Sequence, residues 1–317
     1  MDNMNRNVLV TGSKGFIGYQ TVLQLQDQGF NVSCVDWAND LTKPGVCVDF
    51  CSDTVRTILK ENEIKTVIHF AADHEVGRSV EEPSVFYNNN IVSSIKFLDK
   101  CIQAGVENFI FSSSSSVYGD TEVFPTIEST SKNPLSPYGR TKDMFEEILK
   151  DYEHAYGIKT LSLRYFNAAG ADPYNRHGYE QEVYSHLIPI LAKCFKENKE
   201  FTVFGTDYDT PDGTCIRDYT HVSDIAQAHI NAIPYLFNNG PEQVFNIGKG
   251  NGESVYDVYK EFILQTGTEV KVNKGERREG DPSKTFADIE LAMKELNWVP
   301  KYNLKDIVEH AIAWENR

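Results

Sequence analysis

Three glycines close to the start of the chain constrain its fold more than any other feature. Gly12, Gly15 and Gly18 follow a short apolar run and open a helical pattern, and a second apolar run after that pattern ends in Asp36. Glycines let the backbone approach a pyrophosphate, a helix N-terminus supplies N–H donors, and an acid after the second strand binds ribose hydroxyls. The stretch therefore predicts a dinucleotide-binding strand–helix–strand unit. Because the Asp36 carboxylate would repel a 2′-phosphate, NAD is favoured over NADP.

The remaining periodicity predicts an α/β fold. Apolar runs typical of strands alternate with helical patterns, which indicates a doubly wound parallel sheet of the Rossmann type. We expect further strands at 46–48, 66–70, 109–111 and 161–165, and helices at 53–61, 83–104 and 138–156. The chain is expected to divide into a dinucleotide-binding domain, 1–172, and a smaller mixed substrate domain, 173–317, with parts such as 218–246 interleaved with the first. In the second part we expect loops at 172–182 and 205–214, helices at 187–195, 222–236, 255–264, 288–296 and 304–314, and a strand at 244–247.

A serine run and a Tyr–Lys pair carry the expected chemistry. Five serines, 112–116, follow the predicted strand 109–111, and Tyr138 and Lys142 lie at the start of a later helical pattern. Residues four apart lie on one face of a helix. An ammonium group lowers the pKa of a nearby phenol, which is ordinarily about 10, and a serine hydroxyl can share the proton of a substrate alcohol. These groups can remove a proton from an alcohol while a hydride leaves its carbon, which requires a hydride acceptor such as NAD.

The charge of the chain limits its partners. A formal net charge of −15 argues against nucleic acid or an anionic membrane as a partner. No run approaches the roughly 20 apolar residues that cross a bilayer. The six cysteines show no C-x-x-C spacing and the opening residues show no apolar signal region, so we expect reduced thiols and a cytoplasmic protein. No metal site is predicted. An anionic ligand would need local donors, such as helix N-termini and arginines.

The motifs resemble those of the extended short-chain dehydrogenase/reductase family, and within it the UDP-glucose 4-epimerases. The resemblance runs from Val8 to about Trp298 and rests on the glycine spacing, the Ser…Tyr-x-x-x-Lys set and three further runs, 164–171, 203–219 and 277–281. It implies NAD-dependent inversion at C4 of a UDP-hexose through a transient 4-keto sugar. It also implies a homodimer formed by the helices near 88–104 and 138–156.

The resemblance assigns roles to individual residues. The catalytic groups would be Ser114, Tyr138 and Lys142. Lys142 would bind the nicotinamide ribose and lower the Tyr138 pKa, with cationic neighbours outweighing burial. Cofactor contacts are expected from Gly12, Gly15, Phe16, Ile17, Gly18, Asp36, Asp49, Phe50, Phe70, Ala71, Ala72, Asn89, Ser112, Tyr138, Lys142, Tyr165 and Phe166. Substrate contacts are expected from Ser114, Tyr138, Asn167, His186, Leu187, Phe204, Arg217, Tyr219, Arg278, Asp281 and Thr285.

Several of these roles are specific. Asn167, Arg217 and Arg278 would bind the diphosphate, Phe204 would pack near the uracil, and Asp281 would bind the uridine ribose. Two arginines would thus supply fork-shaped donors inside an acidic protein.

Two positions bear on the reaction and its substrates. Ser115 and Ser116 stand where related sugar-nucleotide dehydratases carry an acid pair, which argues against water elimination. Thr285 stands where epimerases restricted to glucose and galactose often carry Tyr, so N-acetylated sugars are expected to be accepted as well.

Two alternative functions stay open. The protein could be an epimerase of UDP-pentoses or UDP-hexuronates. It could also be an NAD-sensing regulator without catalysis, against which the intact Ser114, Tyr138 and Lys142 argue.

Overall fold

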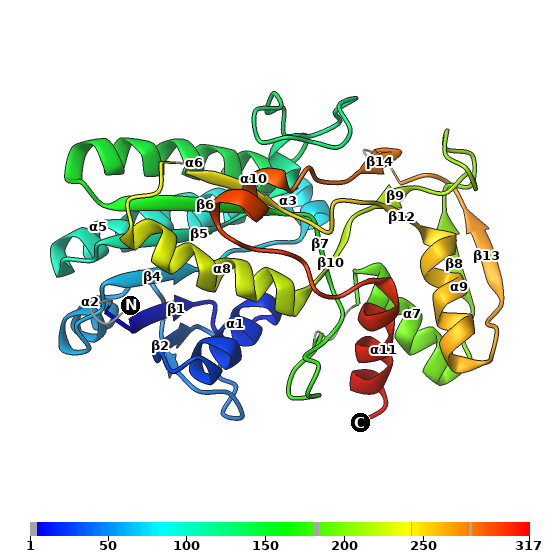
Figure 1. The fold of residues 1–317 in the computed structure, drawn as a ribbon, viewed down its shortest axis with the longest axis horizontal. Helices are drawn as coiled ribbons and strands as arrows, with labels where there is room; N and C mark the ends of the chain where they lie inside the picture. Colours follow the sequence, from blue (N-terminus) through cyan, green and yellow to red (C-terminus); the bar gives the residue numbers. More distant parts are fainter. Residues whose placement is uncertain (1–4, 181–183, 242, 279–280) are drawn as a thin grey trace.

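A computed structural model describes residues 5–180, 184–241, 243–278 and 281–317. The opening tetrapeptide, the end of the expected loop 172–182, and Glu279 and Gly280 of the 277–281 run lie outside the described residues. Figure 1 shows a sheet with helices on both faces, continued by a smaller body that holds α7, α9 and α11.

A seven-stranded parallel sheet forms the core of the larger body. Its strand order is β11-β6-β5-β4-β1-β2-β3, which is the order of a dinucleotide-binding fold with β11 added at one edge. The expected Rossmann sheet is therefore confirmed. The strands are β1 (Asn7–Thr11), β2 (Asn31–Asp36), β3 (Val46–Cys47), β4 (Thr66–His69), β5 (Asn108–Ser114), β6 (Lys159–Tyr165) and β11 (Val244–Ile247).

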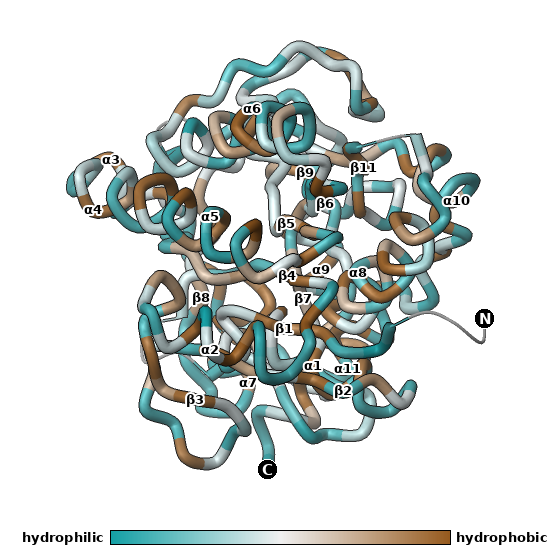
Figure 2. The backbone as a smooth tube through the Cα atoms, turned by 90° about the vertical axis from the view of Figure 1, so that its left-hand side faces the viewer, coloured by the Kyte–Doolittle hydropathy of each residue, from teal (hydrophilic) through white to brown (hydrophobic). Residues whose placement is uncertain are grey.

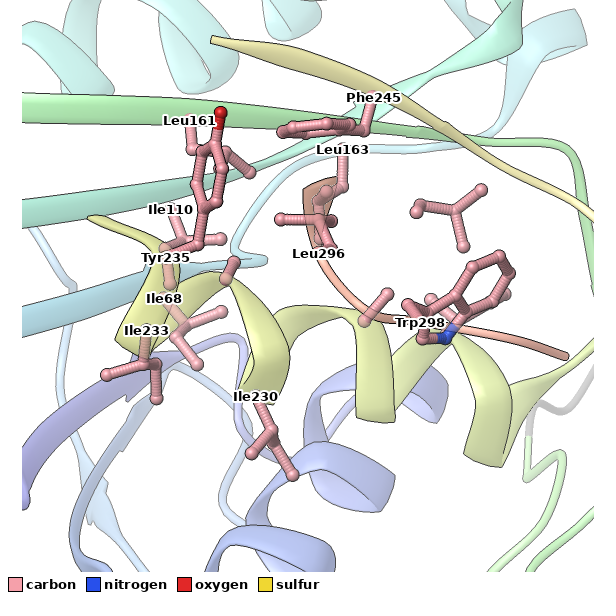
Figure 3. Packing of buried hydrophobic residues seen from close by; sticks show 14 of the residues in the cluster. Ile68, Ile110, Leu161, Leu163, Ile230, Ile233, Tyr235, Phe245, Leu296 and Trp298 are labelled. Carbon is pink, nitrogen blue, oxygen red and sulfur yellow. The ribbon is translucent and has the colours of Figure 1, made fainter. Parts of the chain in front are cut away.

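Two apolar layers hold helices against the sheet. On one face, α1 (Phe16–Asp27) and α8 (Val222–Phe237) cover side chains from β1, β4, β5, β6 and β11. Figure 3 shows this layer, with Ile110 and Leu163 above α8 and Leu296 and Trp298 beside them. On the other face lie α2 (Asp53–Glu61), α5 (Ser94–Ala104) and α6 (Pro137–Tyr156). Because both faces are covered, almost every position on the central strands β1, β4, β5 and β6 is buried.

The segment expected as one helix over 83–104 is a broken helix. It consists of α4 (Pro83–Tyr87), a π-helical turn η1 (Asn88–Ser93) and α5, and an additional short helix, α3 (Val76–Glu81), precedes it. The buried Asn90 side chain accepts from Asp73 N at 2.8 Å and donates to Asp73 O at 3.0 Å and to Thr141 Oγ1 at 3.1 Å. These bonds tie the turn to two neighbouring elements. A π-helical turn inside a longer helical segment is frequently found at a functional site.

The serine run is structured. β5 does not end at Phe111 but continues through Ser114, and Ser115–Val117 form a 3₁₀ turn, η2. Serine has a weak strand preference, but here the residues lie between β4 and β6 in the centre of the sheet, and that pairing determines the conformation.

The smaller body has its own apolar core. It contains α7 (Leu187–Glu197), α9 (Val255–Thr266) and α11 (Leu304–Glu315), packed on the pair β8 (Phe201–Phe204) and β13 (Val272–Gly275). Two small sheets link it to the larger body: β7 (Asn167–Ala169) with β10 (Tyr219–His221), and β9 (Ile216–Arg217) between β12 (Glu253–Ser254) and β14 (Lys284–Thr285). Helix α10 (Glu290–Glu295) packs back on the large sheet. Within the described ranges, no helix is both long and apolar enough to cross a membrane.

Candidate active site

The glycine loop lies where the strand order of the sheet reverses, between β1 and β4. Gly12 has φ +66°, and a Cβ there would come within 2.7 Å of Ala71 N, so only glycine fits. A Cβ on Gly18 would lie 2.1 Å from Gly12 O. Helix α1 starts directly after Gly15, without a side-chain cap. Its first N–H groups, including those of Phe16 and Ile17, are therefore oriented toward the loop as anion donors.

Asp36 lies at the end of β2 with its carboxylate fixed by the main chain. Lys14 N donates to Oδ2 at 2.8 Å and Ala38 N donates to Oδ1 at 2.9 Å. The adjacent β3 ends before Asp49, which is exposed, whereas the Phe50 ring is buried against His69 and Phe97. Phe50 can therefore contact a cofactor only through its main chain.

The loop after β4 forms the next wall of the crevice. Phe70, Ala71 and Ala72 are half-buried, and Ala71 lies against Gly12. Asn89, predicted to contact the cofactor, lies half-buried in η1, and the neighbouring Asn90 fixes this loop to α6. Sequence reasoning missed Asn90, although the run of three asparagines marked the position.

The Ser, Tyr and Lys side chains expected to be catalytic converge at the ends of β5 and α6. Ser114 Oγ accepts from Ser116 N at 3.1 Å and hydrogen-bonds to Tyr138, which lies in the first turn of α6. Lys142 is buried one helical turn further on, with Nζ 5.7 Å from the centre of the Tyr138 ring. Lys142 Nζ donates to Ser112 O at 2.8 Å, and the Tyr165 hydroxyl donates to Ser112 Oγ. The Ser114, Tyr138 and Lys142 side chains thus lie close together where β5 ends and α6 begins.

The electrostatics of this cluster differ from the expectation in one respect. Burial raises the pKa of Tyr138, and the hydrogen bond from Ser114 only partly opposes that effect. Burial also lowers the pKa of Lys142 to about 7, opposed by the charge of Glu146. The pKa of Tyr138 is therefore raised in the structure, and not lowered as expected, because desolvation of the phenolate outweighs the hydrogen bond from Ser114. The position of Tyr138 near the positive end of α6 favours the phenolate.

Two residues that sequence reasoning missed support the cluster. Glu146 is buried one turn after Lys142, and its carboxylate accepts from Ser113 Oγ at 2.6 Å and from Arg164 Nε at 2.9 Å. It thereby ties α6 to β5 and β6 directly behind Ser114. Gly139 lets α6 approach the serine turn, since a Cβ there would lie 2.7 Å from Ser116 O. The spacing of four residues after Lys142 was the available signal for Glu146.

The predicted substrate residues lie on the linking strands and the smaller body. Tyr165 is buried at the end of β6, and half-buried Phe166 and Asn167 follow it into β7. Tyr219 pairs with Asn167 and is buried, and Thr285 pairs with Arg217. His186 occupies the N-cap position of α7 without a side-chain capping bond, and Leu187 begins that helix. Burial lowers the pKa of His186 to about 4.

The arginines already have partners. Arg217 forms an ion pair with Asp281 and donates to Pro282 O at 2.7 Å. Arg278 stacks on the half-exposed Phe204 ring at 4.4 Å. The Arg217–Asp281 pair thus joins a group predicted for the diphosphate to one predicted for the ribose, and the Arg278–Phe204 pair joins a group predicted for the diphosphate to one predicted for the uracil.

These features define a class. A glycine loop between β1 and α1, an acid at the end of β2 and a Ser–Tyr–Lys cluster at the end of β5 are together typical of a short-chain dehydrogenase/reductase, and the glycine cradle and Asp36 fit NAD.

Comparisons with known proteins identify the family. The model of the NAD dependent epimerase/dehydratase family matches residues 8–248, and the chain belongs to that family. It is 39% identical to UDP-glucose 4-epimerase of Rhizobium meliloti (strain 1021), over 99% of this chain and 98% of the relative. Among solved structures, UDP-glucose-4-epimerase from Stenotrophomonas maltophila, with bound NAD and formylated UDP-arabinopyranose, superposes with a TM-score of 0.94 at 35% identity, covering 98% of each chain. The Brucella ovis enzyme in complex with NAD gives 0.93 at 38% identity, covering 97% of each.

Proposed function

We propose that this protein is an NAD-dependent enzyme that inverts C4 of UDP-hexoses and interconverts UDP-glucose and UDP-galactose. The observation that carries the proposal is the convergence of Ser114, Tyr138 and Lys142 beside the dinucleotide loop. Ser115 and Ser116 add no carboxyl group for water elimination. The family and the relatives support the same reaction.

The residues of the chain divide the work. Bound NAD supplies a reversible hydride acceptor for C4. The Tyr138 phenolate takes the proton of the sugar O4 as the hydride leaves, which gives a 4-keto sugar, and Ser114 donates a hydrogen bond to O4. After the keto sugar has turned over in the site and the hydride has returned to its opposite face, Tyr138 returns the proton. No net oxidation occurs. Lys142 holds the cofactor ribose and favours the phenolate by its charge.

The nucleotide half of the substrate must stay bound while the sugar rotates. Arg217 and Arg278 supply guanidinium donors for the diphosphate, and Asp281 exchanges its bond with Arg217 for the uridine ribose when substrate enters. The Phe204 ring offers a stacking surface for uracil.

The substrate range extends to N-acetylated sugars. Thr285, half-buried on β14, carries no ring that would block an acetamido group at C2 as the keto sugar turns. The test compares wild type with Thr285→Tyr on UDP-GlcNAc and UDP-galactose at matched concentrations. We expect the variant to lose only the N-acetylated substrate. A wild type inactive on UDP-GlcNAc would refute this extension.

The active form is a homodimer. Val76 and Val80 on α3, Val92 on η1 and Met144 on α6 are between 43% and 64% exposed. Both α3 and η1 pack against α6, and Figure 2 shows α3 beside α4 and α5, with α6 above them. Apolar side chains gathered on adjacent helices are typical of an interface. Light scattering after gel filtration should give twice the chain mass. Paired Val92→Lys and Met144→Lys substitutions should give a monomer, and a monomeric wild type at micromolar concentration would contradict the dimer.

One assay tests the reaction itself. Purified protein is incubated with UDP-galactose without added reductant, and UDP-glucose is followed by chromatography. UDP-xylose and UDP-glucuronate serve as parallel substrates. Formation of UDP-glucose supports the proposal, turnover of only the pentose or uronate would replace it, and no turnover of any of them would refute it.

A further inference from the structure

Asp218 joins β9 to β10 and is fully buried. Its carboxylate receives four hydrogen bonds. Oδ1 accepts from Lys249 N at 2.7 Å and Thr220 Oγ1 at 3.1 Å, and Oδ2 accepts from Gly250 N at 3.1 Å and Ala287 N at 3.2 Å. Three of the donors are main-chain N–H groups from segments that are 31 to 69 residues away in sequence. The carboxylate therefore fastens the loop after β11 and the segment after β14 to one point.

The main chain of the same residue extends this junction. Asn167 N donates to Asp218 O at 3.0 Å, and Asp218 N donates to Thr285 O at 3.0 Å. Arg217 precedes Asp218 and pairs with Thr285 across β9 and β14. Asp218 thus hydrogen-bonds to Asn167 and Thr285 and directly follows Arg217, and all three are proposed to contact the diphosphate or the sugar.

We infer that Asp218 is a positioning residue for the UDP-sugar: it sets the spacing of Asn167, Arg217 and Thr285 without contacting the substrate. This inference rests on the proposed function. Buried carboxylates are costly unless every acceptor is used, and here both oxygens are used twice. The main chain packs closely around this carboxylate, because a Cβ on Gly248 would lie 2.5 Å from Asp218 Oδ2.

Asparagine at this position cannot replace the carboxylate. It has nearly the same shape, but its amide nitrogen donates and cannot accept. With the amide nitrogen in the place of Oδ1, Lys249 N loses its acceptor, whereas the Thr220 hydroxyl can turn and accept from the amide. With the amide nitrogen in the place of Oδ2, both Gly250 N and Ala287 N lose their acceptor. Unpaired buried donors are unfavourable, so a segment that bears on the substrate should move.

The chain offers a matched control. Asp224 is also buried, at 2% exposure, and accepts from Lys301 N at 3.0 Å and Tyr302 N at 3.1 Å. Its bonds go to a segment that carries none of the proposed substrate residues. Asp224→Asn should therefore lower stability in the same way as Asp218→Asn without disturbing the substrate.

The experiment measures UDP binding by calorimetry, along with kcat, KM and bound NAD, in wild type, Asp218→Asn and Asp224→Asn. We expect Asp218→Asn to weaken UDP binding and raise KM about tenfold or more, with kcat within about threefold and NAD content unchanged. Asp224→Asn should melt at a lower temperature with wild-type UDP affinity. Unchanged UDP binding in Asp218→Asn, or an equal loss in Asp224→Asn, would overturn the inference.

Two outcomes are separated by design. A wild type that neither binds UDP nor turns over UDP-galactose defeats the proposed function rather than the role of Asp218. If Asp218→Asn does not fold, Gly248→Ala applies the same test, because its methyl group presses on Oδ2. Weaker UDP binding with retained kcat supports the inference, and unaltered UDP binding in that variant refutes it.

Discussion

Removing one oxygen from Tyr138 separates the chemistry from the fold. The ring is 9% exposed, and its hydroxyl bonds to Ser114, whose Oγ keeps its bonds to Ser116 N and Oγ at 3.1 Å each when the phenol is lost. Tyr138→Phe should therefore cost about one hydrogen bond, roughly 1 kcal/mol of stability. General acid–base work contributes about 10²–10⁴ in rate, or about 3–5 kcal/mol of barrier, so the loss of turnover should far exceed the loss of stability.

The assay follows UDP-galactose turnover, thermal melting and the absorbance of bound NAD. Tyr152→Phe is the control, because Tyr152 lies on the same helix and also loses one hydrogen bond, to Asp99 Oδ1 at 2.6 Å. We expect Tyr152→Phe to keep near wild-type turnover and Tyr138→Phe to lose at least about a hundredfold while retaining NAD. A Tyr138→Phe variant within a few-fold of wild type would remove Tyr138 from the mechanism.

Three further predictions concern the cofactor, the anchors and acid stability. NADP should bind much more weakly than NAD because of Asp36, although the Lys14 ammonium lies nearby, bonded to Ala38 O at 2.9 Å; equal binding of both in calorimetry would refute this role. Arg278→Lys keeps the charge but loses the fork, so UDP affinity should fall several-fold, and an unchanged affinity would place Arg278 outside the diphosphate site. Burial lowers the pKa of His229 to about 4 in the folded state, whereas the unfolded value is about 6.5. The contribution of His229 to the free energy of unfolding is therefore complete above about pH 6.5. It is lost as the pH falls toward 4, at up to about 1.4 kcal/mol per pH unit. Urea unfolding should thus show lower stability at pH 5 than at pH 7, less so in His229→Gln, and equal slopes in both proteins would contradict the assignment.

The larger body could be predicted because its signals are local. Glycines at 12, 15 and 18, the acid at 36 and alternating apolar runs each fix one element, and the parallel order follows from their sequence. The short strands β7 to β10 and β12 to β14 carry no such signal. They have two to four residues each, and distant pairing determines them. The domain boundary at 172 remains a prediction.

The residues of the site were predictable by type but not by environment. The spacing of Tyr138 and Lys142 predicts that they act together. The direction of the shift in the Tyr138 pKa, however, depends on burial, which cannot be seen in a sequence. Glu146 and Asp218 went unnoticed because charged residues are rarely buried, so a solvent-facing position was the reasonable expectation. Their roles depend on partners from other strands and loops.

The most direct test of the reaction is to run it in D₂O. Protein carrying its bound NAD is incubated with UDP-galactose, and the product is examined by ¹H NMR. Because the C4 hydrogen leaves and returns as a hydride, UDP-glucose should form with hydrogen fully retained at C4 and without added reductant. Deuterium at C4 would show that a proton, and not a hydride, is removed from carbon, and would contradict the role given to Tyr138, Ser114 and Lys142.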